Sequence, residues 1–289
     1  MEQLNYHEIV EKLAEIDQRL RQMDLNQHDR IRIHLRNLSK LAEAHDHGSL
    51  AQTANNLTGE QRREILWSFL ESIELVDAVD ALQKRGCDIP KAVWMKVLKG
   101  PPDAYLEDDK SNQGRNAMFE LWVAGRVAFA GLEPRLGGEP DVSFEFENRR
   151  MLVQCKRVLS EPAVAKRIGE AAKQLDRDLA LSADLKDCGV IAISISRLFN
   201  PGDKMLTVAT ETDLQSALSS EIDKVIERHA QVFRGVKNPK TAGIFLQMTT
   251  PAFVEERGLY TAAQSATVYH IPGKSDAGLL RSLATVIRM

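Results

Sequence analysis

The change in hydrophobic pattern near residue 100 is the feature that most restricts the fold. Before it, apolar residues recur every three or four positions, as between residues 9 and 20, which is the spacing of one face of a helix. Thr58 and Gln61 have the spacing of a capping box and predict the start of another helix. The stretch Gly100–Gly114, with two prolines and a charged run, predicts a linker. We therefore expect an all-helical N-terminal region over residues 1–100.

After this point, strand and helix patterns alternate. The predicted elements are a helix at 115–130, extended runs at 132–136, 141–147 and 150–157, a helix within 161–186, a strand at 188–196, a helix at 211–234, strands at 241–248 and 266–271, and a last helix after Ser275. Such alternation predicts an α/β domain over residues 101–289, in which helices flank a mixed sheet.

The composition excludes several classes of protein. No apolar run in the 289 residues approaches the roughly 18–20 needed to cross a bilayer, and the N-terminus has no signal-peptide pattern. The three cysteines stand far apart with no CxxC pair, which favours reduced thiols. We therefore expect a soluble, cytoplasmic protein with no membrane partner. The net charge of −3 excludes a globally basic nucleic-acid coat but leaves room for a local basic face.

Residues 140–157 have the pattern of a β-hairpin. Apolar side chains alternate with mostly polar ones in both halves, so each strand has an apolar and a polar face. A two-residue turn at Asn148-Arg149, or a four-residue loop centred there, pairs positions whose numbers sum to 297. Asp141 is then opposite Lys156, and Ser143 is opposite Gln154. The hairpin is expected to bring an acid, an amide and a lysine together.

A fourth polar group precedes the hairpin. Glu120 lies in a predicted helix that is apolar nearly all round over 117–129, and its helical neighbours include no cation. A buried, unpaired carboxylate costs several kcal/mol. Glu120 therefore requires a positive partner from elsewhere, such as a metal ion, Lys156 or an arginine.

These residues carry a family resemblance. The order Phe119-Glu120 in a helix, Pro140-Asp141, then Gln154-Cys155-Lys156 at the end of a hairpin resembles the PD-(D/E)XK nuclease superfamily. The Gln-x-Lys version is similar to Mrr-like restriction endonucleases. The resemblance implies a restriction-endonuclease-like fold and Mg²⁺-dependent (or Mn²⁺-dependent) hydrolysis of phosphodiester bonds in DNA by an endonuclease. It also implies a role in restriction or antiviral defence.

The resemblance also implies roles for the four residues. A hard cation such as Mg²⁺ would take the Asp141 carboxylate, the Gln154 amide oxygen and the Cys155 backbone carbonyl. Glu120 would bind the metal through water or hold a second ion. Lys156 would orient or deprotonate the attacking water, or neutralise charge on the transition state.

Positive residues are concentrated next to these motifs. Eight lysines and arginines and three acidic residues lie between 149 and 177, an excess of five that predicts a local basic surface for phosphate contacts. The weaker candidates for nucleic-acid contact are Arg157, Lys166, Arg167, Lys173 and Gln174. For an enzyme that cuts both strands we expect a homodimer. The N-terminal helices offer surfaces for dimerisation, for substrate recognition, or for sensing a partner protein or ligand.

Simpler interpretations stand beside these. Asp141 could be only a strand-start residue, Gln154 and Lys156 could be solvated, and Glu120 could form a structural ion pair with Lys156. The basic segment could be an ordinary solvated helix face. At the level of function, the alternatives are a catalytically inactive nucleic-acid-binding or assembly subunit of the same fold, and an RNA-cutting nuclease.

Overall fold

The N-terminal region is helical, as predicted. The computed structural model describes residues 5–25, 29–50, 56–101, 106–108, 111–182, 186–202, 204–273 and 277–287. Within these ranges, the helices before residue 100 are α1 (Tyr6–Gln22), α2 (Asp29–Asp46), α4 (Gly59–Lys84) and α5 (Lys91–Val97). The predicted capping box is confirmed: Thr58 N donates to Gln61 Oε1 at 3.0 Å, and Gln61 N donates to Thr58 Oγ1 at 3.2 Å.

The remainder is a mixed α/β structure, also as predicted. The strands are β1 (Arg135–Leu136), β2 (Val142–Phe146), β3 (Arg149–Arg157), β4 (Cys188–Ser194), β5 (Leu206–Val208), β6 (Thr241–Val254) and β7 (Leu259–His270). They form one seven-stranded sheet in the order β1-β2-β3-β4-β6-β5, with β7 also paired to β6. The pairs β3–β4, β4–β6 and β5–β6 are parallel, whereas β1–β2, β2–β3 and β6–β7 are antiparallel.

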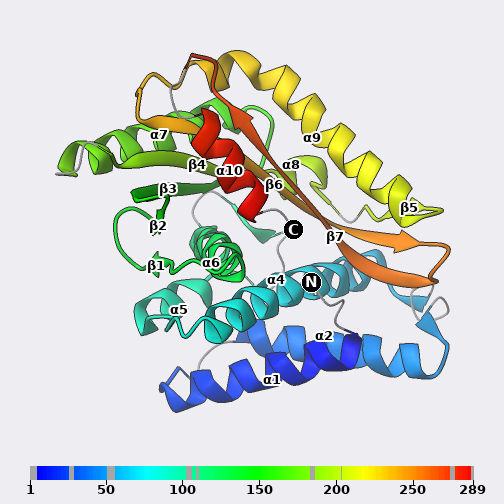
Figure 1. Cartoon of the computed structure of the whole chain (residues 1–289). Coiled ribbons are helices and arrows are strands. Elements are labelled where there is room, and N and C mark those ends of the chain that lie inside the picture. The colour runs from blue at the N-terminus through cyan, green and yellow to red at the C-terminus, as the bar shows by residue number, and fades with distance from the viewer. Residues whose placement is uncertain are drawn as a thin grey trace.

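Helices cover both faces of the sheet (Figure 1). The helices that complete the fold are α6 (Gln113–Phe129), α7 (Ala163–Leu181), α8 (Ser196–Phe199), α9 (Glu211–Arg234) and α10 (Ala277–Ile287). Side chains of α7 and α9 pack in one apolar core with one face of the sheet. Side chains of α6, α10 and the N-terminal helices share a second core with the opposite face. The N-terminal helices thus pack on the helix that carries Glu120.

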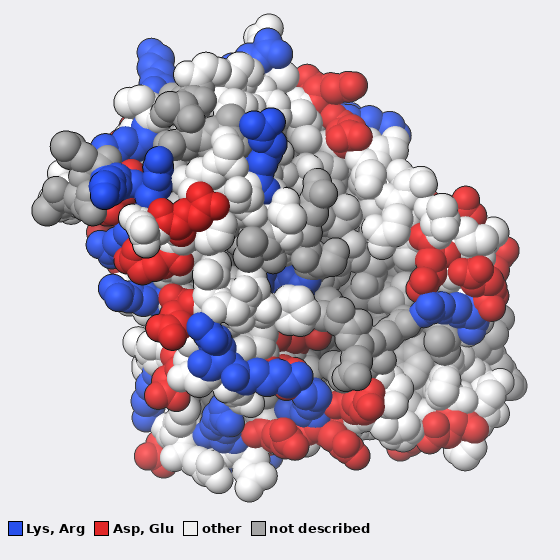
Figure 2. Space-filling model, in the orientation of Figure 1, with Lys and Arg blue, Asp and Glu red and all other residues white. Residues whose placement is uncertain are grey.

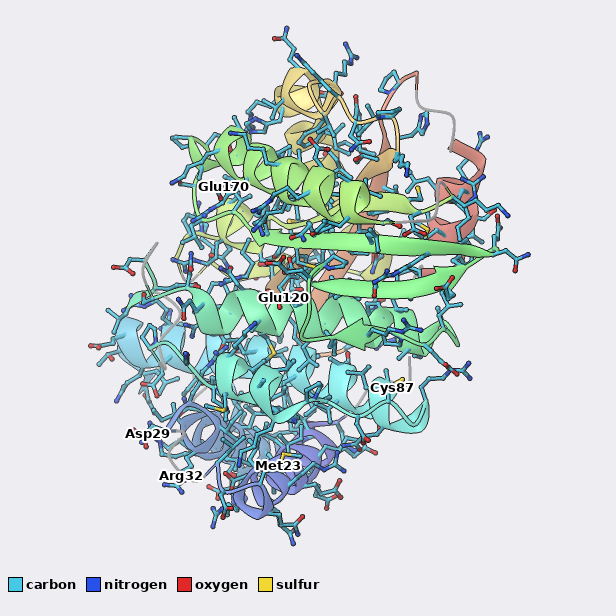
Figure 3. All side chains as sticks on the ribbon, turned by 90° about the vertical axis from the view of Figure 1, so that its left-hand side faces the viewer. Met23, Asp29, Arg32, Cys87, Glu120 and Glu170 are labelled. Carbon is cyan, nitrogen blue, oxygen red and sulfur yellow. The ribbon has the colours of Figure 1, made fainter. Side chains whose placement is uncertain are left out.

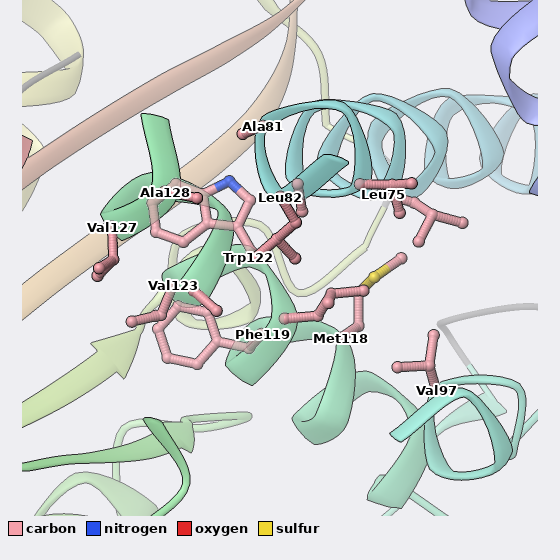
Figure 4. Close-up of a cluster of buried hydrophobic side chains, with 14 of the residues drawn as sticks. Leu75, Ala81, Leu82, Val97, Met118, Phe119, Trp122, Val123, Val127 and Ala128 are labelled. Atoms are coloured by element: carbon pink, nitrogen blue, oxygen red, sulfur yellow. The ribbon is translucent and has the colours of Figure 1, made fainter. Parts of the chain in front are cut away.

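Helix α6 is buried on nearly all sides because it lies between α4, α5 and the sheet. Phe119 and Trp122 stack with ring centroids 6.0 Å apart, and Met118 lies in the same cluster near Leu75 of α4 and Val97 of α5 (Figure 4). Gly125 permits this close packing, because a Cβ at that position would lie 2.5 Å from the Cα of Ala78 in α4. The position of α6, and of Glu120 with it, therefore depends on direct backbone contact with α4.

The β2–β3 hairpin differs from the predicted register. Paired positions sum to 295, with Val142 opposite Val153 and Phe146 opposite Arg149. The two turn residues are Glu147 and Asn148, with φ of 48° and 58°. A tight hairpin turn of this kind needs positive φ at both central positions, which Asn tolerates well. Since the shift is two residues, each side chain keeps its predicted face.

Several boundaries also differ from the prediction. Strand β4 ends at Ser194 rather than 196, and the short strand β5 was not predicted. Strands β6 and β7 are much longer than predicted, because they pair with each other from Gly243–His270 to Val254–Leu259. Pro251 lies within this pairing; proline ordinarily weakens a strand prediction because it lacks an N–H.

The predicted linker at 100–114 lies partly outside the described residues. Its described part is packed against the rest of the protein: a Cβ on Gly114 would clash with the carbonyl of Lys99, and Glu107 pairs with Arg157 at the end of β3. None of the helices within the described ranges is long and apolar enough to cross a membrane.

Candidate functional site

The predicted acid, amide and lysine residues lie around the C-terminal end of β3. Asp141 directly precedes β2, Gln154 and Lys156 are in β3, and Glu120 comes from α6. Figure 3 shows Glu120 between α6 and the strands, with Glu170 on α7 on the other side of the sheet. The site is thus formed where a helix, a hairpin and a second helix meet.

Asp141 is held by the backbone of β3. Its Oδ2 accepts a hydrogen bond from Cys155 N at 2.8 Å and lies 3.9 Å from Lys156 Nζ. The expected proximity of Asp141 and Lys156 therefore exists, although the two are not cross-strand partners. The side chain of Lys156 is only 16% exposed, so this ion pair is poorly screened by solvent.

Glu120 is a buried acid close to another acid. The pKa of Glu120 is raised to about 7: burial and the nearby Asp141 raise it, whereas Lys96 and Lys156 act in the opposite direction. The pKa of Asp141 is raised as well, first by burial, against the hydrogen bond from Cys155 and the charge of Lys156. The two carboxylates oppose each other's ionisation, which favours binding of an additional cation between them.

The side-chain amide of Gln154 has a hydrogen-bonded nitrogen and an oxygen with no hydrogen-bond partner among the described residues. Its side chain is 3% exposed, and its Nε2 donates to Asp178 Oδ2 in α7 at 2.7 Å. Its Oε1 is buried, and no donor in the described part of the chain binds it. A buried carbonyl oxygen without a donor is costly, and it is also the type of oxygen that Mg²⁺ binds.

Cys155 contributes its backbone rather than its thiol. The side chain is buried in the core beneath α6, and burial raises the pKa of its thiol well above the ordinary value. A thiol held in the neutral form is a poor nucleophile and a poor metal ligand. The role of its backbone carbonyl as a metal ligand stays a prediction.

The donor set fits a weakly held divalent cation. It comprises the Asp141 carboxylate, the unpartnered Gln154 Oε1 and the Glu120 carboxylate, all oxygen donors of the kind that Mg²⁺ prefers. Among the described residues, no three His, Cys, Asp or Glu side chains converge as a ready-made metal cluster. The amide at position 154 brings no charge, so fewer acidic ligands are available than in a site with acids at every position.

The basic surface is smaller than the sequence count predicted. Arg149 and Arg150 lie at the turn end of β3, roughly 20 Å along the strand from Lys156. Arg157 is 10% exposed and pairs with Glu107 at 2.5 Å, so it does not join a surface with α7. The positive residues counted in the sequence therefore lie in three separate places: at the turn end of β3, in the pair with Glu107, and along α7 beside Lys156. They are separated because residues that are far apart along an extended strand are also far apart in space.

Helix α7 nevertheless presents cations beside Lys156. A hollow of about 580 Å³ is lined by Lys156, Glu170, Lys173, Gln174, Asp176 and Arg177. Lys166 is exposed, whereas Arg167 is paired with Glu170 at 3.0 Å. The Oε1 of Gln174 is buried and has no partner among the described residues. Figure 2 shows both signs of charge along the left-hand edge of the molecule, where Figure 1 places α7.

Two residues near the site were not predicted from the sequence. Asp178 binds Gln154 and acts on the pKa of Asp141, and Lys96 of α5 acts on the pKa values of both Glu120 and Asp141. Asp178 lies one helical turn after Gln174 and shares its face, so the helical spacing was available as a signal. Lys96 had no such signal, since it belongs to the N-terminal helices.

A cleft larger than the hollow beside Lys156 lies elsewhere. Its volume is about 1030 Å³, and residues of α1, α4, α9 and β7 line it. It contains none of the residues discussed above, and size alone does not assign chemistry to a cleft. One of its lining residues is Asp77, whose pKa burial raises to about 6.

Comparison with protein families, with curated proteins and with solved structures finds no match for this chain. The fold therefore defines a class, a mixed α/β protein with a helical N-terminal region, and the functional interpretation depends on the site's own chemistry.

Glu120→Gln should stabilise the metal-free protein at alkaline pH. The pKa of Glu120 is raised to about 7 from 4.5, so between these values the unfolded chain releases a proton that the folded chain retains. Retention of this proton stabilises the folded wild-type protein at low pH, and this stability is lost as the pH rises through 7. The glutamine of the variant does not titrate. The free energy of unfolding of the variant minus that of wild type should therefore be larger at about pH 8 than at about pH 5, by on the order of 3 kcal/mol.

Urea unfolding of both proteins at the two pH values, in EDTA, measures this effect. Glu145→Gln removes a carboxylate from an exposed position on β2 and serves as the control, with no pH-dependent difference expected. An equal stability difference at both pH values would show that Glu120 ionises normally.

Proposed function

We propose that this protein is a metal-dependent endonuclease that hydrolyses phosphodiester bonds in DNA, with a restriction-endonuclease-like domain of the Mrr-like type. The observation that carries the proposal is the meeting of Glu120, Asp141 and Lys156 at the end of β3, the strand in which Gln154 also has a buried oxygen without a partner among the described residues. A structural ion pair between Glu120 and Lys156 would account for neither the raised pKa of Asp141 nor the unsatisfied amide oxygen.

Asp141, Gln154 Oε1 and Glu120 would hold the cation, with the Cys155 carbonyl as a further candidate. Bound Mg²⁺ would supply a Lewis acid for the phosphate and lower the pKa of a water. The Cys155 N–H holds one oxygen of the Asp141 carboxylate and so orients the group. Lys156 stands close enough to Asp141 to place its ammonium at a phosphate bound there, where it would stabilise developing negative charge.

The substrate is proposed to approach along α7. Lys173 and Arg177 line the hollow beside Lys156, and lysine and arginine contacts to phosphates position nucleic acid without reading its sequence. The few exposed cations predict weak, salt-sensitive binding by this chain alone, which is consistent with the proposed homodimer.

Nicking of supercoiled plasmid tests the proposal directly. We expect cleavage with Mg²⁺ or Mn²⁺, its loss in EDTA, and its loss in Asp141→Ala, because that change removes a charged donor. Glu145→Ala on β2 is the control that should cut like wild type. Circular dichroism and unfolding curves verify that Asp141→Ala is folded. Cleavage that survives both EDTA and Asp141→Ala would rule out this site.

Two observations favour a second candidate, an inactive nucleic-acid-binding subunit of the same fold. No cluster of three acidic, histidine or cysteine ligands forms within the described ranges, and position 154 is an amide. Binding to DNA without cleavage, equal in EDTA and Mg²⁺, would support this candidate. Parallel reactions with structured and single-stranded RNA would identify an RNA-cutting enzyme.

A further inference from the structure

The contact between Gln154 and Asp178 fixes which end of the amide faces α7 and which end faces away from Asp178. A glutamine amide has a donor end and an acceptor end of nearly the same shape, so it can turn over within the same space. Gln154 Nε2 donates to Asp178 Oδ2 at 2.7 Å. Because an ionised carboxylate can only accept hydrogen bonds, the NH₂ group must face Asp178, and Oε1 must face away from it.

Oε1 is the end of the amide that a cation can use. It is buried, and no donor within the described ranges binds it. The turned-over orientation would present an NH₂ group in its place, and an NH₂ group repels a cation. Any group that selects between the two orientations therefore also controls whether position 154 can be a metal ligand.

Asp178 also contributes negative charge to the site, although it is not itself one of the proposed metal ligands. It acts on the pKa of Asp141, which places it in the same electrostatic environment. A hydrogen bond to a charged acceptor is stronger than a neutral one, and it polarises the amide toward a more negative oxygen. The Gln154–Asp178 pair as a whole carries the single negative charge that a carboxylate at position 154 would bring.

We propose that Asp178 is a positioning residue, which holds Gln154 with Oε1 directed to the divalent cation and supplies the charge that the amide lacks. This inference rests on the proposed metal-dependent function and names a residue that acts through a ligand. Partners that orient a metal ligand typically change metal affinity by about 10–100-fold when they are removed.

Asp178→Asn is the discriminating change. An asparagine can accept from Gln154 Nε2 or donate to Gln154 Oε1, so it no longer selects one orientation. We expect the variant to bind Mn²⁺ about 10–100-fold more weakly and to need correspondingly more Mg²⁺ for cleavage. Its urea unfolding midpoint in EDTA should stay near that of wild type, which a purely structural role for Asp178 does not predict.

The double change Gln154→Glu with Asp178→Asn provides a rescue. A glutamate at 154 presents oxygen at both ends and restores the lost charge, so Mn²⁺ affinity should return to within a few fold of wild type. Gln154→Glu alone should be impaired, because it places two carboxylates in the 2.7 Å contact. Glu145→Gln is the charge-matched control and should bind as wild type does.

Isothermal titration calorimetry with Mn²⁺ on the full chain separates the possible failures. Weakened binding in Asp178→Asn with rescue in the double variant supports the inference. Wild-type affinity in Asp178→Asn overturns it and leaves the proposed function standing. No binding of Mn²⁺ to the wild type overturns the metal-dependent function and the positioning role with it.

Discussion

Replacement of Lys156 by methionine should reduce DNA cleavage by about 10²–10⁴-fold, the range typical for loss of a group that transfers a proton or stabilises a transition state. Methionine preserves most of the buried stem but removes the ammonium that lies 3.9 Å from Asp141. Initial rates of plasmid nicking at saturating Mg²⁺ measure the effect.

Two further variants identify what Lys156 does. Lys156→Arg keeps the positive charge; substantial activity would assign an electrostatic role, and loss comparable to methionine would assign proton transfer or exact positioning. Lys173→Met, at an exposed position on α7 that lines the same hollow, should weaken DNA binding but retain most of the maximal rate. Full activity in Lys156→Met would exclude this lysine from the chemistry.

The second large effect concerns stability. Glu71→Gln should lower the free energy of unfolding by about 3–5 kcal/mol, as expected when one partner of a buried ion network is removed. Glu71 of α4 is 5% exposed. Its Oε2 accepts from Arg30 Nε at 2.9 Å and from Arg30 Nη2 at 2.7 Å, and its Oε1 accepts from Arg115 Nε. The substitution removes the negative charge of Glu71 from its contacts with two buried guanidinium groups.

Urea denaturation near neutral pH measures this loss. Glu64→Gln is the matched control, because Glu64 pairs with Arg36 at 3.0 Å in a partly exposed position and should cost no more than about 1 kcal/mol. The environment of Glu71 holds its pKa well below 4.5 through the charges of Arg115 and Arg30, against the opposing effect of burial. Its contribution should therefore persist above pH 4.5 and disappear as the pH falls below that value. A midpoint shift for Glu71→Gln no greater than that for Glu64→Gln would contradict the argument.

This network also connects the helical region to the site. Arg30 is in α2, Glu71 is in α4, and Arg115 is in the first turn of α6, the helix that carries Glu120. Arg30 Nη1 also donates to the carbonyl of Val97 in α5 at 2.9 Å. The N-terminal helices thus hold α6 in place, and α5 adds the charge of Lys96 to the electrostatics of Glu120.

Much of the candidate site could be predicted from local patterns in the sequence. The alternation in residues 140–157 assigned the faces of the hairpin correctly, because side-chain direction in a strand has a fixed period of two. The turn position was wrong by one residue at each end, because turn type depends on backbone φ that hydrophobic pattern does not encode. The unpartnered state of Gln154 Oε1 could not be predicted, since it depends on which helix packs over the strand.

The amino-acid sequence by itself determined most of the helical and strand segments, though not β5 or the length of β6 and β7, together with the polar face of β3 and the presence of an acid in an apolar helix that must find a cation. Only the tertiary structure decided that Asp178 faces Gln154, that Arg157 is withdrawn into a pair with Glu107, and that Lys96 influences Glu120 from a distant segment. The physical reason is that periodicity orients a side chain within its own element, whereas the burial and electrostatic environment of a charge depend on elements that meet only when the chain has folded.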